Sequence, residues 1–198
     1  GQLLVGDFQN ALVTRVFLEK VNGEYQGAVF PFITDFRSGV NRLSFGPDGN
    51  LYVGGLQRTW PSIAPDPASL DRVTFTGDTP FSIRKVEAKP DGFLLTFTEP
   101  AKPSAADPDN FDVSQFRYTY HSDYGSPRFN HAGEKDSQPP VEVTDATLSA
   151  SRLELRLSLN GWRGGHVTQV RCFDMISEAG KDLWHDTFHY TLNQIPKP

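Results

Sequence analysis

Apolar and polar residues alternate over short stretches along nearly the whole chain. In 12–21, apolar side chains occupy both odd- and even-numbered positions and therefore both faces of the strand. This is typical of a β-strand that lies between stacked sheets. Stretches of this kind predict strands at 3–8, 12–21, 25–33, 41–45, 51–55, 70–76, 83–88, 93–97, 111–120, 141–143, 153–159, 166–173 and 187–192. No segment shows a convincing apolar period of 3.6 residues, so the pattern predicts an all-β protein.

Two dipeptides predict tight hairpins between neighbouring strands. Asn22-Gly23 lies between the strands predicted at 12–21 and 25–33, and Asp48-Gly49 follows the strand predicted at 41–45. The chain contains 17 Gly and 15 Pro, which are spread along it rather than clustered. That distribution favours many short strands joined by turns.

Two interruptions of the pattern divide the chain into predicted domains. Segment 60–69 carries three prolines and predicts an irregular connector, and Gly77-Asp78-Thr79-Pro80 interrupts the chain again. Residues 80–198 hold roughly seven predicted strands, the number that a small immunoglobulin-like β-sandwich needs. We therefore expect one β-segment at 1–79 and an immunoglobulin-like sandwich at 80–198.

Charge and hydropathy exclude some classes of partner. The net charge is −5, whereas contacts with nucleic-acid phosphates need a basic surface. No stretch approaches ~18 consecutive apolar residues, so no membrane span is expected. Segment 1–6 lacks a basic start and enters a strand pattern at once, which predicts no signal peptide and a chain cut from a longer protein.

Cys172 is the single cysteine, which excludes an internal disulfide and a multi-cysteine zinc site. It alternates with Arg171 and Phe173 in a predicted strand. Because free cysteine is among the most buried residue types, we expect a small buried strand residue rather than a reactive thiol.

Several stretches together resemble one protein family. Residues 39–55, with the turn Gly46-Pro47-Asp48-Gly49-Asn50, look like a late β-propeller blade of proteins similar to pyrroloquinoline-quinone-dependent glucose and sorbosone dehydrogenases. Residues 1–32, with Tyr25-Gln26-Gly27-Ala28, resemble the preceding blade in large multidomain bacterial members. Residues 81–100 and 190–196 resemble the region that follows the propeller, so the resemblance covers nearly the whole chain.

This resemblance implies a periplasmic or secreted parent protein, with pyrroloquinoline quinone (PQQ) and calcium as cofactors of the intact parent only. No residue here matches the family's catalytic His or calcium ligands. The resemblance therefore implies a non-catalytic structural or interaction portion, with other domains of the parent as partners. The alternatives are a carbohydrate-binding module and a fragment that completes a quinone-dependent dehydrogenase site in the intact chain.

Arg42 and Arg58 are the candidate cofactor-binding residues, since both lie near loop ends of the blade-like segment. Arginine suits a carboxylate-bearing cofactor because its planar fork donates two parallel hydrogen bonds. The alternative is structural: an arginine that pairs with Asp48 or packs on Trp60.

Two histidine groups have spacings that suggest metal ligands. His185 and His189 are four residues apart, but a strand there would separate them by roughly 13 Å. His121, Asp123 and His131 flank one polar loop, and a loop that brought the three together would make a metal site. The structural interpretation is favoured for both groups, so we expect no metal in this chain.

Four aromatic residues surround the same loop: Tyr118, Tyr120, Tyr124 and Phe129. Exposed aromatic rings stack on sugar rings, which makes them the best candidates for a carbohydrate-binding surface. The alternative is burial, because Phe116, Tyr118 and Tyr120 alternate on one face of a predicted strand. No Gly-x-Ser-x-Gly elbow, phosphate loop or dinucleotide fingerprint occurs.

The blade-like segment presents more apolar faces than two blades can cover. These faces are predicted to include Val13, Phe17, Val29, Phe30, Phe32, Leu43, Phe45 and Tyr52. Because two blades cannot close a ring, we expect them to pack against the sandwich or against a second copy of the chain. Self-association through 1–79 is therefore a further expectation.

Overall fold

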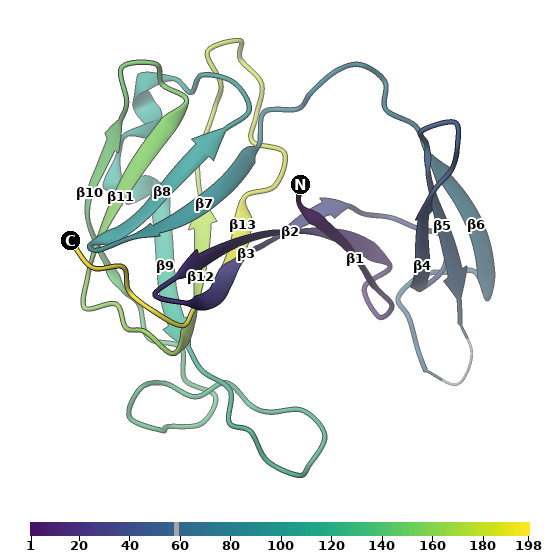
Figure 1. Ribbon diagram of the computed structural model, residues 1–198, viewed down its shortest axis with the longest axis horizontal. Coiled ribbons are helices and arrows are strands. Elements are labelled where there is room, and N and C mark those ends of the chain that lie inside the picture. The colour runs from purple at the N-terminus through teal and green to yellow at the C-terminus, as the bar shows by residue number, and fades with distance from the viewer. Residues whose placement is uncertain (58–59) are drawn as a thin grey trace. The chain divides into compact units, whose positions relative to one another are not determined.

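A computed structural model describes residues 1–57 and 60–198 (Figure 1). The described residues form β-strands and two 3-10 turns, with no α-helix among them, which confirms the all-β prediction. The strands are β1 (Leu3–Asp7), β2 (Leu12–Val21), β3 (Glu24–Ile33), β4 (Val40–Phe45), β5 (Leu51–Leu56), β6 (Ala68–Val73), β7 (Ile83–Lys89), β8 (Gly92–Phe97), β9 (Phe111–Phe116), β10 (Glu142–Leu148), β11 (Glu154–Asn160), β12 (His166–Cys172) and β13 (Thr187–Leu192). The 3-10 turns are η1 (Pro103–Ala105) and η2 (Pro108–Asn110).

The chain forms two compact units. The first consists of Gly1–Val16 and Val29–Thr79, and the second of Phe17–Ala28 and Pro80–Pro198. The long hairpin of β2 and β3 therefore contributes its base to the first unit and its end to the second (Figure 1). The alternating pattern of 12–21 predicted the strand but not this division.

The first unit has a small core of its own. In it, β1 pairs antiparallel with the Leu12–Val16 part of β2, and β4, β5 and β6 form a three-stranded sheet. The core contains Ala11, Val13, Phe36, Val40, Leu51, Val53 and Ala64. Leu43 and Phe32 pack against this core within the unit itself, and Phe45 is 67% exposed. Part of the expected apolar face is thus left uncovered within this unit.

The turn between β4 and β5 is built as the Asp48-Gly49 pair predicts. Gly49 has φ +77°, and its N–H donates to the Gly46 carbonyl at 3.0 Å. The Asp48 carboxylate accepts hydrogen bonds from Asn50 and from the Tyr52 hydroxyl at 2.9 Å, and these bonds hold the pKa of Asp48 below its usual value. Asp48 is therefore occupied by its own turn rather than by an arginine.

The second unit consists of two sheets that pack against each other. One has the order β10-β11-β8-β7, and the other has β9-β12-β13 with β3 beside β13. Phe93 of β8 lies 4.8 Å from Tyr190 and 6.4 Å from Phe188 of β13, measured between ring centroids. All three side chains are fully buried, so these aromatic rings form the centre of the core.

The end of the β2–β3 hairpin is shaped by its turn and by one close approach. Asn22 and Gly23 both have positive φ, +48° and +92°, as the favoured two-residue hairpin turns require. A Cβ at Gly27 would lie only 1.9 Å from the Phe17 carbonyl oxygen. Glycine at 27 is therefore needed for the two strands to run this close together.

Hydrogen bonds fix the hairpin end to both sheets of the second unit. The Glu19 carboxylate accepts a bond from the Tyr190 hydroxyl of β13 and another, at 2.7 Å, from the Ala88 N–H of β7. Gln26 Oε1 accepts from the Gln194 N–H at 2.9 Å, and Asn193 Nδ2 donates to the Tyr25 carbonyl. One carboxylate of the hairpin thus reaches both layers of the sandwich.

The strand predicted at 111–120 ends earlier, at Phe116. The length of its antiparallel partner β12 determines this end. Phe116 pairs with Val167, and Val167 is only one residue from the first residue of β12, His166. Among the described residues, β9 has no strand beside it beyond Phe116; Arg117 forms an isolated antiparallel bridge with Phe129, and the chain leaves the sheet. Tyr118 and Tyr120 therefore belong to a loop, which corrects the sequence prediction.

Replacing Glu19 tests the attachment of the hairpin. In a Glu19→Ala variant the buried Ala88 N–H and the Tyr190 hydroxyl lose their acceptor, which should lower the free energy of unfolding by about 2–4 kcal/mol. The measurement is urea unfolding, with Glu24→Ala as a control that removes the same charge from an exposed site. Equal stability of the two variants, within about 0.5 kcal/mol, would contradict the role of Glu19.

Candidate functional site

The loop that follows β9 (Figure 1) carries three of the exposed aromatic residues, Tyr118, Tyr120 and Tyr124. Its base is closed by two backbone hydrogen bonds between Arg117 and Phe129, of 2.8 and 2.9 Å. Tyr120 and Tyr124 are 103% and 98% exposed, and Tyr118 is 55% exposed. Phe129 is half-buried at the base. The structure thus presents three of the four sequence-predicted aromatics to solvent.

The base of this loop covers the outer face of the β9-β12-β13 sheet. Phe116 is buried there, with the Arg128 guanidinium 4.3 Å from its ring centroid and the Tyr118 ring packed edge-on at 5.3 Å. The burial interpretation is therefore right for Phe116. It is wrong for Tyr118 and Tyr120, whose rings are exposed.

A polar network fastens the returning part of the loop to the sheet. Gln138 Nε2 donates to Ser114 Oγ at 2.6 Å and to Gln169 Oε1 at 3.1 Å, and Arg128 Nη1 donates to Gln138 Oε1 at 2.5 Å. His189 Nε2 donates to Gln169 Oε1 at 3.2 Å. Burial, and secondly the charge of Arg128, lower the pKa of His189. His189 is thus a neutral member of a structural network.

The histidine pairs singled out by spacing lie in different surroundings. His185 precedes β13 and packs beside Trp184, whereas His189 lies within that strand. His121 Nδ1 accepts a hydrogen bond from the Asp123 N–H at 3.2 Å, and His131 lines a separate cavity. In residues 1–57 and 60–198, no group of three or more His, Cys, Asp or Glu side chains is arranged to hold a metal ion.

Of the two arginines proposed to bind a cofactor, the structure describes only Arg42. Arg42 is exposed, and its Nη1 donates to the carbonyl of Asn41 at 2.8 Å and to its side-chain oxygen at 2.7 Å. It pairs across the sheet with Gly54 of β5. Arg58 lies outside the described residues. Arg42 is therefore a surface residue whose side chain bonds to its own neighbour in the chain.

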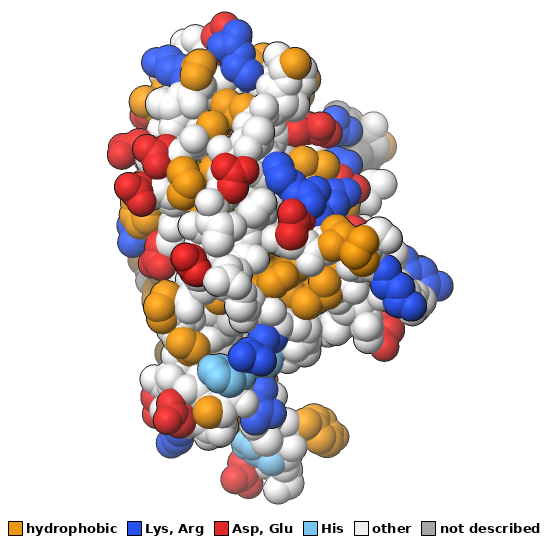
Figure 2. All heavy atoms as spheres, turned by 90° about the vertical axis from the view of Figure 1, so that its left-hand side faces the viewer, with side chains coloured by type: hydrophobic (Ala, Val, Ile, Leu, Met, Phe, Trp, Pro, Cys, Tyr) orange, Lys and Arg blue, Asp and Glu red, His pale blue; other side chains and the backbone are white. Residues whose placement is uncertain are grey.

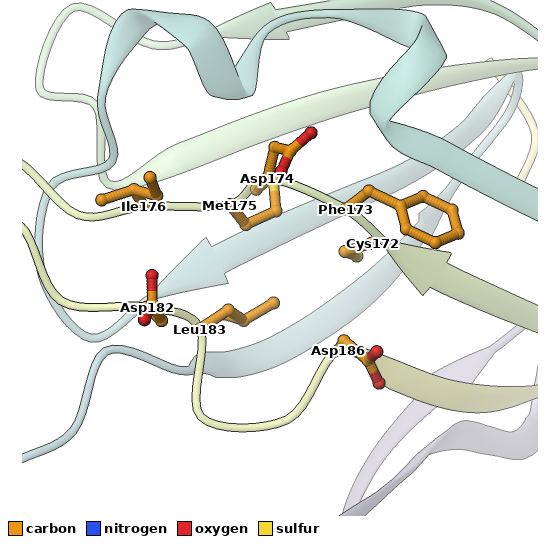
Figure 3. Close-up of a pocket in the computed structure, with 8 residues that line it drawn as sticks. All are labelled: Cys172, Phe173, Asp174, Met175, Ile176, Asp182, Leu183 and Asp186. Atoms are coloured by element: carbon orange, nitrogen blue, oxygen red, sulfur yellow. The ribbon is translucent and has the colours of Figure 1, made fainter.

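Three aspartates border a cavity of about 290 Å³ beside β12 and β13 (Figure 3). Asp174 and Asp182 come from the segment that joins these strands, and Asp186 directly precedes β13. The Asp186 carboxylate lies 3.5 Å from Arg171 Nε. The remaining lining is largely apolar and includes Cys172, Phe173, Met175, Ile176 and Leu183.

A larger and mostly apolar cavity, of about 480 Å³, lies in the first unit. It is lined by Asn10, Ala11, Leu12, Thr34, Asp35, Phe36, Ile63, Ala64 and Pro65. Ala11 and Asp35 have positive φ values of +49° and +65°, which side chains other than glycine adopt at a cost in energy. Its size falls within the usual range of ligand pockets, and its lining suits an apolar group.

A third cavity, of about 100 Å³, contains residues that the sequence interpretation missed. His166, Arg163 and Gln115 line it together with His131. The available signal was the segment Gly161–His166, in which two basic residues lie among three glycines. Strand periodicity assigned His166 only to the start of a strand.

We expect Cys172, which lines the cavity bordered by the three aspartates, to be chemically unreactive. Burial, and secondly the charge of Asp186, raise the pKa of the Cys172 thiol to about 12. At about pH 8 only about one Cys172 in ten thousand is then a thiolate, so iodoacetamide should leave the native chain unlabelled. Mass spectrometry of native and urea-unfolded chain checks this, because unfolding should restore full labelling. Native labelling at the rate of the unfolded chain would contradict the assigned burial.

No protein-family model, no curated protein sequence and no solved structure matches this chain. The assignment of a function therefore rests on the residues, cavities and surfaces described above.

Proposed function

We propose that this chain is a non-catalytic structural and interaction portion of a longer secreted or periplasmic protein. One observation carries the proposal: large apolar side chains are exposed on and beside the sheets of the first unit. They are Leu3, Val5, Phe45, Leu56, Trp60, Ile63, Leu70 and Phe75. A partner surface that covered them would stabilise the complex, because burying each such side chain is worth roughly 1.5–3 kcal/mol.

The outer face of the β4-β5-β6 sheet is suited to such a partner. Leu70 of β6 pairs across the sheet with Gly54 of β5, and Leu70 is 76% exposed. A Cβ built at Gly54 would lie 3.6 Å from the Cβ of Arg42, an ordinary van der Waals contact, so this face is flat at Gly54. A glycine in the middle of a strand often marks a place where another backbone approaches closely. A further sheet of the parent chain is the partner that we propose for this face.

The order of the strands supports a blade-like character for the first part of the chain. Consecutive strands are neighbours in β1-β2-β3 and again in β4-β5-β6, as in the meandering blades of a propeller. Blades protect their faces by stacking on one another. We propose that these two three-stranded meanders are parts of blades whose remaining neighbours lie elsewhere in the parent protein.

The strand order of the second unit supports an immunoglobulin-like sandwich. Constant-type immunoglobulin domains have strands A, B, E and D in one sheet and C, F and G in the other. Counting from β7 as strand A, the order β7-β8-β11-β10 corresponds to the first sheet and β9-β12-β13 to the second. Such sandwiches commonly serve as interaction modules, and the end of the β2–β3 hairpin extends the second sheet here.

The state of the titratable groups also favours a non-catalytic role. Cys172 is buried with a raised pKa, and His189 has its Nε2 hydrogen bonded to Gln169.

On the face drawn in Figure 2, acidic and basic side chains are interspersed, and the net charge is −5. None of the described segments forms a helix long and apolar enough to cross a membrane.

The exposed tyrosines support a second candidate function, carbohydrate binding. Tyr118, Tyr120 and Tyr124 project from one loop, and flat exposed rings of this kind stack on sugars. Asp123 and Arg128 supply neighbouring polar groups. We expect any glycan-array signal of the chain to be lost in a Tyr120→Ala, Tyr124→Ala variant and kept in a Trp184→Ala control. A signal that is equal in both variants would exclude this loop as the site.

The interaction role is tested by comparing this chain with a longer version that includes its upstream coding sequence. Hydroxyl-radical labelling of Phe45 and Phe75 should fall severalfold in the longer protein, because added sheets cover them. Trp184 of the second unit is 58% exposed and serves as an internal control whose labelling should not change. Unchanged labelling of Phe45 and Phe75 would contradict the proposal.

A further inference from the structure

His166, at the start of β12, has a ring nitrogen with no partner. Its Nδ1 lies 2.9 Å from the carbonyl oxygen of Gly164. Because a carbonyl only accepts hydrogen bonds, Nδ1 carries the proton of the neutral ring. The other nitrogen, Nε2, is buried and has no hydrogen-bond partner among the described residues. A buried polar atom without a partner costs free energy and indicates a place for a ligand.

The cavity beside His166 is held open by a fixed loop. It measures about 100 Å³ and is lined by Gln115, His131, Pro139, Pro140, Val141, Gly161, Arg163 and His166. The Gln115 amide accepts from the Arg163 N–H at 2.8 Å and donates to the Arg163 carbonyl at 3.1 Å and to Thr168 Oγ1 at 2.9 Å. Gln115 is thus occupied in shaping the loop, and a ligand would be bound by the basic side chains.

Every ionisable side chain in the lining is basic. These residues are His131, Arg163 and His166, and the Arg163 guanidinium makes no hydrogen bond or ion pair in the described part of the chain. Two acids near the lining in sequence are engaged elsewhere: Glu134 accepts from Asn130 at 2.5 Å and Glu142 from Asn160 at 2.8 Å. A metal cation would be repelled by the permanent charge of the arginine.

We propose that this cavity binds an oxyanion, the carboxylate or phosphate group of a ligand. Arg163 presents the planar fork that fits two oxygens of such a group. When His166 is protonated, its Nε2–H donates to the anion while its Nδ1–H stays on Gly164. A cavity of this volume has room for a group of a few heavy atoms, since liquid water takes about 30 Å³ per molecule.

Two kinds of ligand carry such an oxyanion, and the basic lining fits both. One is free inorganic phosphate, and the other is the carboxylate of an organic acid or sugar acid. Pro139, Pro140 and Val141 form an apolar wall on which the remainder of an organic acid can pack. The shared element is the oxyanion bound by Arg163 and His166.

The test is a titration of the full 198-residue chain, followed by the NMR signals of its imidazole rings. Acetate, glucuronate and inorganic phosphate are added separately at about pH 6 and at about pH 8, on either side of the range in which imidazole usually titrates. The variants are Arg163→Gln and His166→Gln. Arg171→Gln removes the same charge from the opposite end of β12 and serves as the matched control.

We expect saturable shifts of the His166 signals with at least one of the three anions, and weaker binding at the higher pH. Arg163→Gln and His166→Gln should each weaken binding about tenfold or more, whereas Arg171→Gln should not. The anion that binds more tightly, carboxylate or phosphate, identifies the kind of ligand. Absence of saturable shifts with all three anions, or an Arg163→Gln variant that binds like the control, would overturn the proposal. Binding of Zn²⁺ alone at these residues would also overturn it.

Discussion

The Glu19 carboxylate reaches both sheets of the second unit from the end of a hairpin that is also part of the first. It accepts from Tyr190 in one sheet and from the Ala88 N–H of β7 in the other. Burial and this hydrogen bond together raise the pKa of Tyr190. An edge strand exposes N–H groups that can pair with other chains, so a carboxylate bound to Ala88 also protects that edge. Because of this contact, the second unit is completed by residues that precede it by some sixty positions in the chain.

Two added segments leave the sandwich only limited surface for binding. The hairpin end lies beside β13, and the returning part of the loop after β9 lies on the outer face through Gln138, Arg128 and Phe116. Both candidate sites lie in loops. The exposed tyrosines lie on one such loop, and the cavity of Arg163 and His166 lies at another.

The sequence predicted each strand well where the local pattern alone decides the structure. Asn22 and Gly23 adopt the positive φ values that their hairpin predicts, and the strand at 12–21 has the predicted bounds. Period-2 alternation tells which residues share a face but not which strand lies beside them. For that reason it did not reveal that residues 17–28 belong with the sandwich.

The candidate sites were harder to predict because they depend on distant partners. The strand at 111–120 is cut short by the limited length of β12, which no local pattern in 111–120 encodes. The alternation of Tyr118 and Tyr120 consequently suggested burial for two exposed rings. His166 is a candidate because its second nitrogen is buried without a partner among the described residues and because it lines the same cavity as Arg163.

The central claim is that the hairpin end is an integral part of the second unit, and amide hydrogen exchange of the full chain tests it most directly. The account predicts that backbone amides of 24–28 exchange at the slow rate of β13 and that Glu19→Ala accelerates exchange in 24–28 and at Ala88 together. Exchange of 24–28 at the rate of the exposed loop after β9, with no change at Ala88 in the variant, would contradict the claim.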